Sequence, residues 1–523
     1  MSQSAIRENA IVLCTLNAKY IHASLGLRYL LANMGDLKPQ TVLREFTIAR
    51  KAQELVDELL GLSPHIIGFG VYIWNVTQTC EVVRLLKAAR PDIKIVLGGP
   101  EVSHEVDQQA IVHLADHVIT GWGDVSFARL CRALLHGPQP LMKVIQGEQP
   151  PLAQIALPYA QYTDADLAHR LLYVEASRGC PFKCEFCLSS LDKTAWAFEL
   201  EAFLAELDTL YRRGARNFKF VDRTFNLKID ASVRILQFFL DRMADDLFVH
   251  FEVIPDHLPD RLKDMIAQFP PGVLQFEVGI QSFNVEVQQR ISRRQDNDKT
   301  VANLHWLVNA SNAHLHTDLI FGLPGETLAS FALGFDRLYA LQPHEIQLGT
   351  LKRLRGTPIA RHTAEYGMVY EAGPPYTVLQ TGAVTAADMQ RFTRLARYWD
   401  LVANSGRFKT SLRLLLSGPS SQGSPFQGFL CFSDWLWQST GKTSGLTPEA
   451  LVDALFDYLT TVAHTDPQAA RQALLADYLH SGARASPKAL QALLHQRATP
   501  GGKPVRALVP RQERHAGPSK IEA

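Results

Sequence analysis

The chain carries one crowded group of cysteines, in the stretch Ser177-Arg178-Gly179-Cys180-Pro181-Phe182-Lys183-Cys184-Glu185-Phe186-Cys187. The spacing is C-x₃-C-x₂-C, and three of the seven cysteines of the chain lie in it. Thiolates are the usual protein ligands of iron–sulfur clusters. Three thiolates can hold three irons of a cubic cluster and leave the fourth iron open to a substrate or cofactor.

Zinc and disulfide alternatives fit this stretch less well. A structural zinc site needs four ligands, and the nearest histidine, His169, lies on the preceding side of the motif. Three cysteines do not pair up into disulfides, and the other four stand far apart, at Cys14, Cys80, Cys131 and Cys431. This usage predicts reduced thiols and a cytoplasmic protein.

The same stretch resembles the signature of radical S-adenosylmethionine (SAM) enzymes. In that family three cysteines hold a 4Fe-4S cluster, and the amino and carboxylate groups of SAM chelate the open iron. The resemblance implies that Cys180, Cys184 and Cys187 are cluster ligands and that Phe186 packs near the adenine of SAM. An electron from the reduced cluster then breaks the sulfonium bond and yields a 5′-deoxyadenosyl radical.

Length and charge limit the remaining possibilities. A chain of 523 residues is too long for one core and predicts two or three domains. With 53 basic and 52 acidic residues the formal net charge is +1, which gives no electrostatic footprint for nucleic acid. The first residues lack a secretory signal pattern. No run of about 18 apolar residues occurs, so we expect no membrane span.

Residues 1–145 alternate short apolar runs with amphipathic segments, a pattern that predicts a doubly wound, Rossmann-like α/β domain. Ligands of such domains sit beyond the carboxyl ends of the parallel strands. The strands are expected at 10–16, 41–47, 66–72, 94–97 and 117–120.

The order of motifs in this domain is similar to the cobalamin-binding domain that precedes many radical SAM domains. The motifs are Ser24-Leu25-Gly26-Leu27-Arg28-Tyr29-Leu30, Gly68-Phe69-Gly70-Val71-Tyr72, Val96-Leu97-Gly98-Gly99-Pro100 and Gly121-Trp122-Gly123-Asp124. The resemblance implies cobalamin contacts from Asn17, His22, Ser24, Leu25, Gly26, Gly70, Tyr72, Gly98, Gly99, Pro100, Gly121 and Gly123.

The first domain departs from the pattern of cobalamin carriers at the histidine that binds cobalt from below. Those carriers have Asp-x-His-x-x-Gly, whereas this chain lacks the acid and has one residue too many between His22 and Gly26. A packing or solvent-facing role for His22 is therefore favoured over cobalt ligation.

The methylthiotransferases also join such a domain to the cysteine motif, but they carry three cysteines in the first domain. Here Cys14 and Cys80 fall near two of those places, and residues 46–50 supply no third thiol. We interpret Cys14, Cys80 and Cys131 as small apolar residues.

A connector at 146–164 precedes a second α/β domain at 165–385, in which six strand–helix units predict a partial (β/α)6 barrel. Polar residues follow its strands, where barrels gather their chemistry. The radical SAM resemblance implies SAM contacts from Asp222, Arg223, Glu252, Glu277, Gln281, Ser282, Phe321, Gly322 and Gly325. The basic stretch 351–358 also resembles the cobalamin-linked pattern, and we interpret it as a solvated loop in preference to a site for an anionic substrate.

Residues 386–498 show helical patterning and resemble a helical extension of unknown function that follows this domain pair in some bacterial proteins. Residues 499–523 are rich in Gly, Pro and Arg without periodicity, which predicts a disordered tail.

These features predict a cobalamin-dependent radical SAM enzyme that methylates an unactivated carbon of an unidentified small molecule or peptide. The resemblance implies three cofactors (a 4Fe-4S cluster, SAM and cobalamin) and an electron donor such as flavodoxin or ferredoxin. An oxidative cyclase similar to the anaerobic Mg-protoporphyrin monomethyl ester cyclase is the main alternative. A methylthiotransferase and a non-catalytic cobalamin carrier or sensor are the others. No catalytic side chain is assigned.

Overall fold

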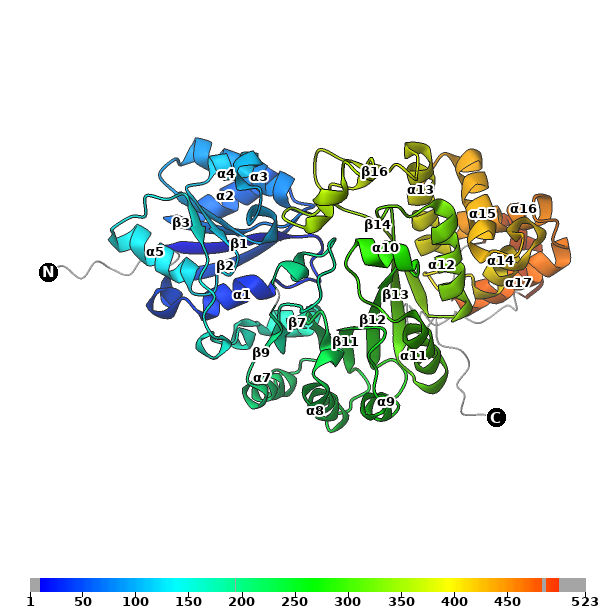
Figure 1. Ribbon diagram of the computed structural model, residues 1–523, viewed down its shortest axis with the longest axis horizontal. Helices are drawn as coiled ribbons and strands as arrows, with labels where there is room; N and C mark the ends of the chain where they lie inside the picture. The colour runs from blue at the N-terminus through cyan, green and yellow to red at the C-terminus, as the bar shows by residue number, and fades with distance from the viewer. Residues whose placement is uncertain (1–9, 193, 482–485, 498–523) are drawn as a thin grey trace. The chain divides into compact units, whose positions relative to one another are not determined.

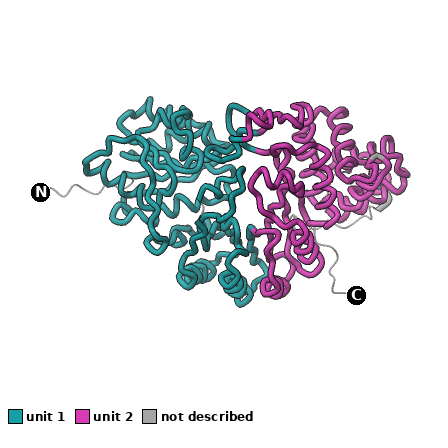
Figure 2. The backbone as a smooth tube through the Cα atoms, in the orientation of Figure 1, with its two compact units in different colours: residues 1–252, 352–361, 371–377 teal, residues 253–351, 362–370, 378–523 magenta. Residues whose placement is uncertain are grey.

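A computed structural model gives the fold and describes residues 10–192, 194–481 and 486–497 (Figure 1). The chain divides into two compact units, which Figure 2 distinguishes by colour. Unit 1 comprises residues 1–252, 352–361 and 371–377, and unit 2 comprises residues 253–351, 362–370 and 378–523.

Unit 1 begins with a parallel sheet of six strands in the order β2-β1-β3-β4-β5-β6. The strands are β1 (Ile11–Asn17), β2 (Thr41–Thr47), β3 (Ile66–Gly70), β4 (Lys94–Gly98), β5 (His117–Thr120) and β6 (Val144–Gln146). Both faces of β1 are buried, as expected for a strand inside a doubly wound sheet. The chain runs outward from β1 in both directions, so the topological switch point lies between β1 and β3.

Helices cover both faces of this sheet (Figure 1). One apolar cluster joins the sheet to α2 (Ala52–Gly61), α3 (Val76–Ala89) and α4 (Ala110–Leu114). A second cluster joins it to α1 (Leu25–Ala32) and α5 (Ser126–His136).

The rest of unit 1 holds the cysteine motif. Parallel strands β7 (Leu172–Val174) and β11 (Phe248–Val253) flank β10 (Asn217–Phe220). A short antiparallel pair, β8 (Ser177–Arg178) and β9 (Trp196–Ala197), closes the loop that contains the cysteines. The helices are α6 (Asp164–His169), α7 (Leu200–Arg212) and α8 (Ile229–Leu240).

Unit 2 contains three parallel strands, β12 (Leu274–Gln281), β13 (His314–Phe321) and β14 (Glu345–Thr350), with β13 in the middle. Its first helices are α9 (Asp260–Ile266), α10 (Val285–Arg290), α11 (Asn297–Ala310) and α12 (Leu328–Ala340). A small antiparallel pair, β15 (Val369–Tyr370) and β16 (Val378–Gln380), follows.

The last part of unit 2 is helical: α13 (Ala386–Val402), α14 (Lys409–Ser417), α15 (Pro425–Thr440), α16 (Pro448–Thr461), α17 (Pro467–His480) and α18 (Gln491–Arg497). Ser424, Thr447 and Asp466 each cap a helix whose first residue is proline. Proline is favourable at this position because the first N–H groups of a helix have no partner within the helix. The Asp477 carboxylate accepts hydrogen bonds from the backbone of Thr410 and Ser411 and therefore ties α17 to α14.

The predicted fold class is confirmed, with a Rossmann-like first domain, further parallel strands alternating with helices, and a helical C-terminal region. Several short elements of six residues or fewer were not expected from the sequence: β6, β8, β9, β15, β16, α4, α6 and α10. The predicted domain boundaries stay a prediction, and the predicted disordered tail, 499–523, lies outside the described residues.

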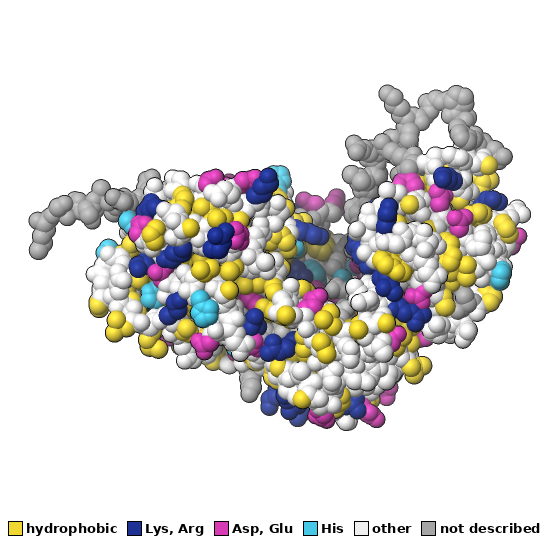
Figure 3. Space-filling model, turned by 90° about the horizontal axis from the view of Figure 1, so that it is seen from above, with side chains coloured by type: hydrophobic (Ala, Val, Ile, Leu, Met, Phe, Trp, Pro, Cys, Tyr) yellow, Lys and Arg dark blue, Asp and Glu magenta, His cyan; other side chains and the backbone are white. Residues whose placement is uncertain are grey.

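No helix in the described ranges is long and apolar enough to cross a membrane. Figure 3 shows positive and negative side chains interspersed on one face, in keeping with the balanced charge.

Candidate cofactor site

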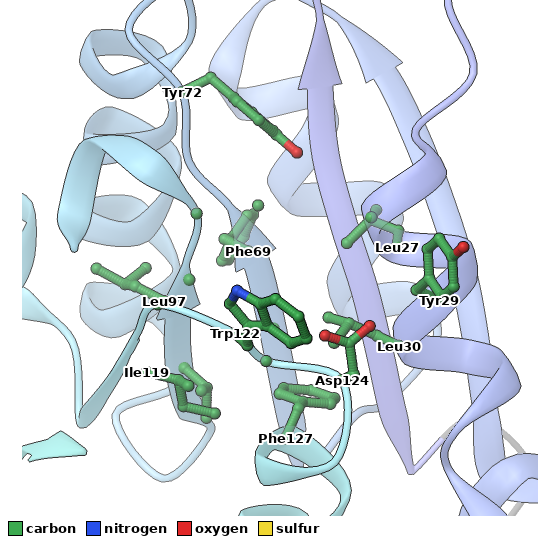
Figure 4. Close-up of a pocket in the computed structure, with 18 of the residues that line it drawn as sticks. Leu27, Tyr29, Leu30, Phe69, Tyr72, Leu97, Ile119, Trp122, Asp124 and Phe127 are labelled. Carbon is green, nitrogen blue, oxygen red and sulfur yellow. The ribbon is translucent and has the colours of Figure 1, made fainter. Parts of the chain in front are cut away.

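A cavity of about 300 Å³ opens in unit 1 beyond the carboxyl ends of β3, β4 and β5, beside α1 (Figure 4). Leu27 and Leu30 of α1 lie on one side, and Trp122 and Phe127, which follow β5, close another. Its position is the one that the strand order predicts for a ligand. The lining is mainly apolar with a few polar groups, as in sites for large cofactors.

Two glycines let the backbone approach closely here. Gly99 has φ of +109°, and a Cβ there would lie 2.5 Å from the carbonyl oxygen of Val71. A Cβ at Gly68 would lie 2.6 Å from the Phe127 ring. Any larger residue at either position would therefore displace the wall of the cavity.

Seven of the twelve residues proposed for cobalamin line the cavity: Gly26, Gly70, Tyr72, Gly98, Gly99, Gly121 and Gly123. Asn17, His22, Ser24, Leu25 and Pro100 are outside the lining set. The site proposal did not include Leu27, Tyr29, Leu30, Gly68, Phe69, Val96, Leu97, Ile119, Trp122, Asp124, Phe127 and Arg178. Nine of these twelve lie inside the four quoted motifs, so assigning every residue of each motif would have found them. Ile119 and Phe127 lie two and three residues outside the fourth motif, and Arg178 belongs to the cysteine motif.

His22 is engaged outside the cavity. Its Nδ1 lies 2.6 Å from the Tyr173 hydroxyl, and the two rings stack with centroids 5.9 Å apart. Burial lowers the pKa of His22, which is the expected direction for an imidazole that loses solvent. These contacts describe a packing histidine.

The cysteine loop gathers three thiols. Cys180 is buried, and Cys184 and Cys187 are half-buried. Burial raises the pKa of Cys180, and the neighbouring thiols of Cys187 and Cys184 raise it further. Gly179, at φ of +83°, leaves no room for a Cβ, which would lie 1.9 Å from the Thr194 carbonyl oxygen.

The donor set suits a cluster held by thiolates. In the described residues, no group of three or more His, Cys, Asp or Glu side chains is arranged to hold a single metal ion.

Arg178 connects the cysteine loop to the cavity. It precedes Cys180 by two residues and also lines the cavity. Its guanidinium donates to both carboxylate oxygens of Asp124, at 2.9 and 3.0 Å, and to Glu175 at 2.8 Å. The guanidinium also lies over the rings of Tyr29 and Trp122.

We expect replacement of Arg178 by Met to lower the free energy of unfolding by about 3–5 kcal/mol, because two largely buried carboxylates lose their common cation. The side chains of Asp124 and Glu175 are 7% and 11% exposed. Urea denaturation of the full chain measures the effect. Arg84→Met, at an exposed pair with Glu81, is the matched control and should leave the unfolding midpoint unchanged; equal midpoints for both variants would contradict the prediction.

The SAM-binding residues proposed in unit 1 are also placed by the structure. The Asp222 carboxylate, after β10, accepts hydrogen bonds from the Ala176 amide at 3.0 Å and the Ser177 hydroxyl at 2.6 Å. Burial outweighs these bonds and raises the pKa of Asp222 to about 7. Arg223 donates to both oxygens of Glu252, at 2.8 and 3.0 Å, and Phe186 is half-buried in the cysteine loop.

In unit 2, Gln281 ends β12 at φ of +70° beside a break in the register with β13. The Ser282 hydroxyl donates to the buried Glu326 carboxylate at 2.6 Å, and burial raises the pKa of Glu326 to about 8. Glu277 lies within β12 and Phe321 ends β13. Gly322 and Gly325 have φ of +88° and +72°.

Three family models match this chain. Residues 11–131 match the B12 binding domain, residues 174–333 the radical SAM superfamily, and residues 364–505 a protein family of unknown function, DUF4080. The first match spans the cavity and the second contains the cysteine loop. The chain therefore combines a B12-binding domain with a radical SAM domain.

Two curated relatives are methyltransferases. The cobalamin-dependent radical SAM methyltransferase TokK of Streptomyces tokunonensis is 25% identical over 56% of this chain and 47% of its own length. The 2-(S-pantetheinyl)-carbapenam-3-carboxylate methyltransferase of Streptantibioticus cattleyicolor is 23% identical over 54% of this chain and 46% of its own length. The chain thus spans about half the length of these relatives.

Two solved structures share the fold. The radical SAM methyltransferase TsrM from Kitasatospora setae, with cobalamin and a 4Fe-4S cluster bound, aligns over 73% of this chain and 83% of its own, with a TM-score of 0.58 and 16% identity. The cobalamin-dependent enzyme OxsB, with aqua-cobalamin bound, aligns over 94% of this chain and 80% of its own, with a TM-score of 0.61 and 14% identity.

Proposed function

We propose that the chain is a cobalamin-dependent radical SAM methyltransferase that modifies an unactivated carbon. The observation that carries the proposal is the placement of Arg178, which lines the glycine-walled cavity of the B12-binding domain and directly precedes the three-cysteine loop. Arg178 thereby connects the cavity, proposed for cobalamin, with the cysteine loop, proposed for the cluster, within unit 1. The methyltransferase names of TokK and of the carbapenam enzyme support this reaction class.

The residues of unit 1 have distinct tasks in this proposal. The thiolates of Cys180, Cys184 and Cys187 would hold the 4Fe-4S cluster, which supplies the electron for SAM cleavage when it is bound. Gly98 and Gly99 would let a corrin ring approach the backbone, and Trp122 would shield it from water.

The SAM contacts remain proposals, at Phe186, Asp222, Arg223 and Glu252 in unit 1 and at Glu277, Gln281, Ser282, Phe321, Gly322 and Gly325 in unit 2. The electron would come from a small reductant such as flavodoxin or ferredoxin. The cytoplasmic location predicted from the thiols stays a prediction.

We expect the reduced, reconstituted protein to release 5′-deoxyadenosine from SAM and to carry label from methyl-deuterated SAM on its extracted corrinoid. Both readouts need no substrate. Mass spectrometry of the nucleoside and of the corrinoid measures them. The nucleoside without corrinoid label would support the cyclase alternative, and the absence of both would support a carrier or sensor.

A further inference from the structure

The basic stretch after β14 belongs with unit 1, although the chain on both sides of it belongs to unit 2. We call residues 352–361 the strap. Its arginines are engaged in ion pairs, which corrects the interpretation of this stretch as a solvated loop.

The strap is anchored first on the loop that follows β4. Arg355 pairs with Glu101 and with Glu105, both at 2.9 Å, and Arg353 pairs with Glu105 at 3.0 Å. Glu101 is only 4% exposed and also accepts a hydrogen bond from the Tyr376 hydroxyl at 2.6 Å. It lies two residues after Gly99, so this anchor holds a wall of the cobalamin cavity.

The strap is anchored again on the cysteine loop. Arg361 donates to both carboxylate oxygens of Glu185, at 2.8 and 2.5 Å. The amide of Ile359 donates to the Glu185 carbonyl oxygen at 3.0 Å. Glu185 lies between Cys184 and Cys187 and is 4% exposed. Paired forks of this kind fix orientation as well as distance.

The strap therefore contacts both the loop after β4, which borders the cavity, and the cysteine loop. Arg355 and Arg361 are six positions apart in the sequence, and a fully extended chain of this length spans at most about 20 Å. The strap also lies close to the loop after β4 at Gly356, where an added Cβ would lie 2.3 Å from the His104 ring.

We infer that the strap is a positioning element that fixes the distance between the cobalamin cavity and the cluster loop, through Arg355 at one end and Arg361 at the other. The inference rests on the proposed function, because it assumes that both cofactors bind. Reactions between two bound groups depend steeply on their separation and orientation, so the strap would control how well SAM cleavage is coupled to methyl transfer.

The test uses the full-length protein loaded with cluster and cobalamin. Pulsed electron paramagnetic resonance measures the distance between Co(II) and the reduced cluster in wild type, Arg361→Gln and Arg355→Lys. Arg361 has a side chain that is 63% exposed, and lysine keeps the charge at position 355 but loses the fork, so both variants should fold. Lys352→Gln is the control within the strap, because Lys352 is exposed.

We expect one narrow distance in wild type and in Lys352→Gln, and a distribution at least about twofold broader in the two arginine variants at unchanged iron and cobalamin content. Distributions equal to wild type in both arginine variants would overturn the inference alone. Failure of the wild type to bind cobalamin or cluster would overturn the proposed function, and the inference with it. Loss of cofactor from an arginine variant alone would overturn the positioning role in favour of a purely structural one.

Discussion

Replacement of Cys184 by Ala is expected to abolish cluster assembly and to reduce the formation of 5′-deoxyadenosine below detection. A cubane held by two thiolates lacks the anchoring that three provide. Cys184 is half-buried, and its loop contains no fourth cysteine that could replace it as a ligand. Iron and sulfide analysis after anaerobic reconstitution, with nucleoside chromatography, measures both effects.

Cys80→Ala is the matched control. Cys80 is also half-buried, but it lies in α3 of the B12-binding domain, so we expect full iron content and unchanged SAM cleavage. Loss of iron in Cys80→Ala would contradict its interpretation as a small apolar residue and would favour a second cluster of the methylthiotransferase type. Retention of the cluster in Cys184→Ala would remove the basis of the ligand assignment.

Local patterns were sufficient for the longer elements of the fold and for the cysteine motif. The alternation of apolar runs with amphipathic segments predicted β1 to β5 within a few residues of their observed ends. Strand β6 was missed because a three-residue edge strand, Val144–Gln146, has no periodicity to detect. Helix α10, Val285–Arg290, was missed for the same reason, because six residues are too few to show a helical period.

Contacts between distant residues were beyond the reach of these patterns. Arg178 and Asp124 are 54 positions apart, and Arg355 and Glu101 are 254 positions apart. In the sequence each arginine looks like an ordinary solvated residue, because its partner is set by the docking of one loop on another. The chemistry of the cofactor regions could therefore be predicted from their motifs, whereas the residues that join those regions required the structure.

Replacement of Gly98 by Leu is expected to weaken cobalamin binding at least about tenfold, equivalent to about 1.4 kcal/mol. Gly98 ends β4 and lines the cavity. The nearest heavy atom to a Cβ built there is the Ile119 carbonyl oxygen at 3.8 Å, so the protein can accept the side chain while the cavity loses volume. Gly99 would be a poorer choice, because its positive φ would strain any substitution.

The binding constant is measured by titrating hydroxocobalamin and following its absorbance. Gly61→Leu is the control, because Gly61 ends α2 and a Cβ there meets no atom within 4 Å. We expect wild-type affinity for this control and full iron content in both variants, since neither position belongs to the cysteine loop. Wild-type affinity in Gly98→Leu would show that the corrin ring binds elsewhere, and the cavity would then lose its assignment.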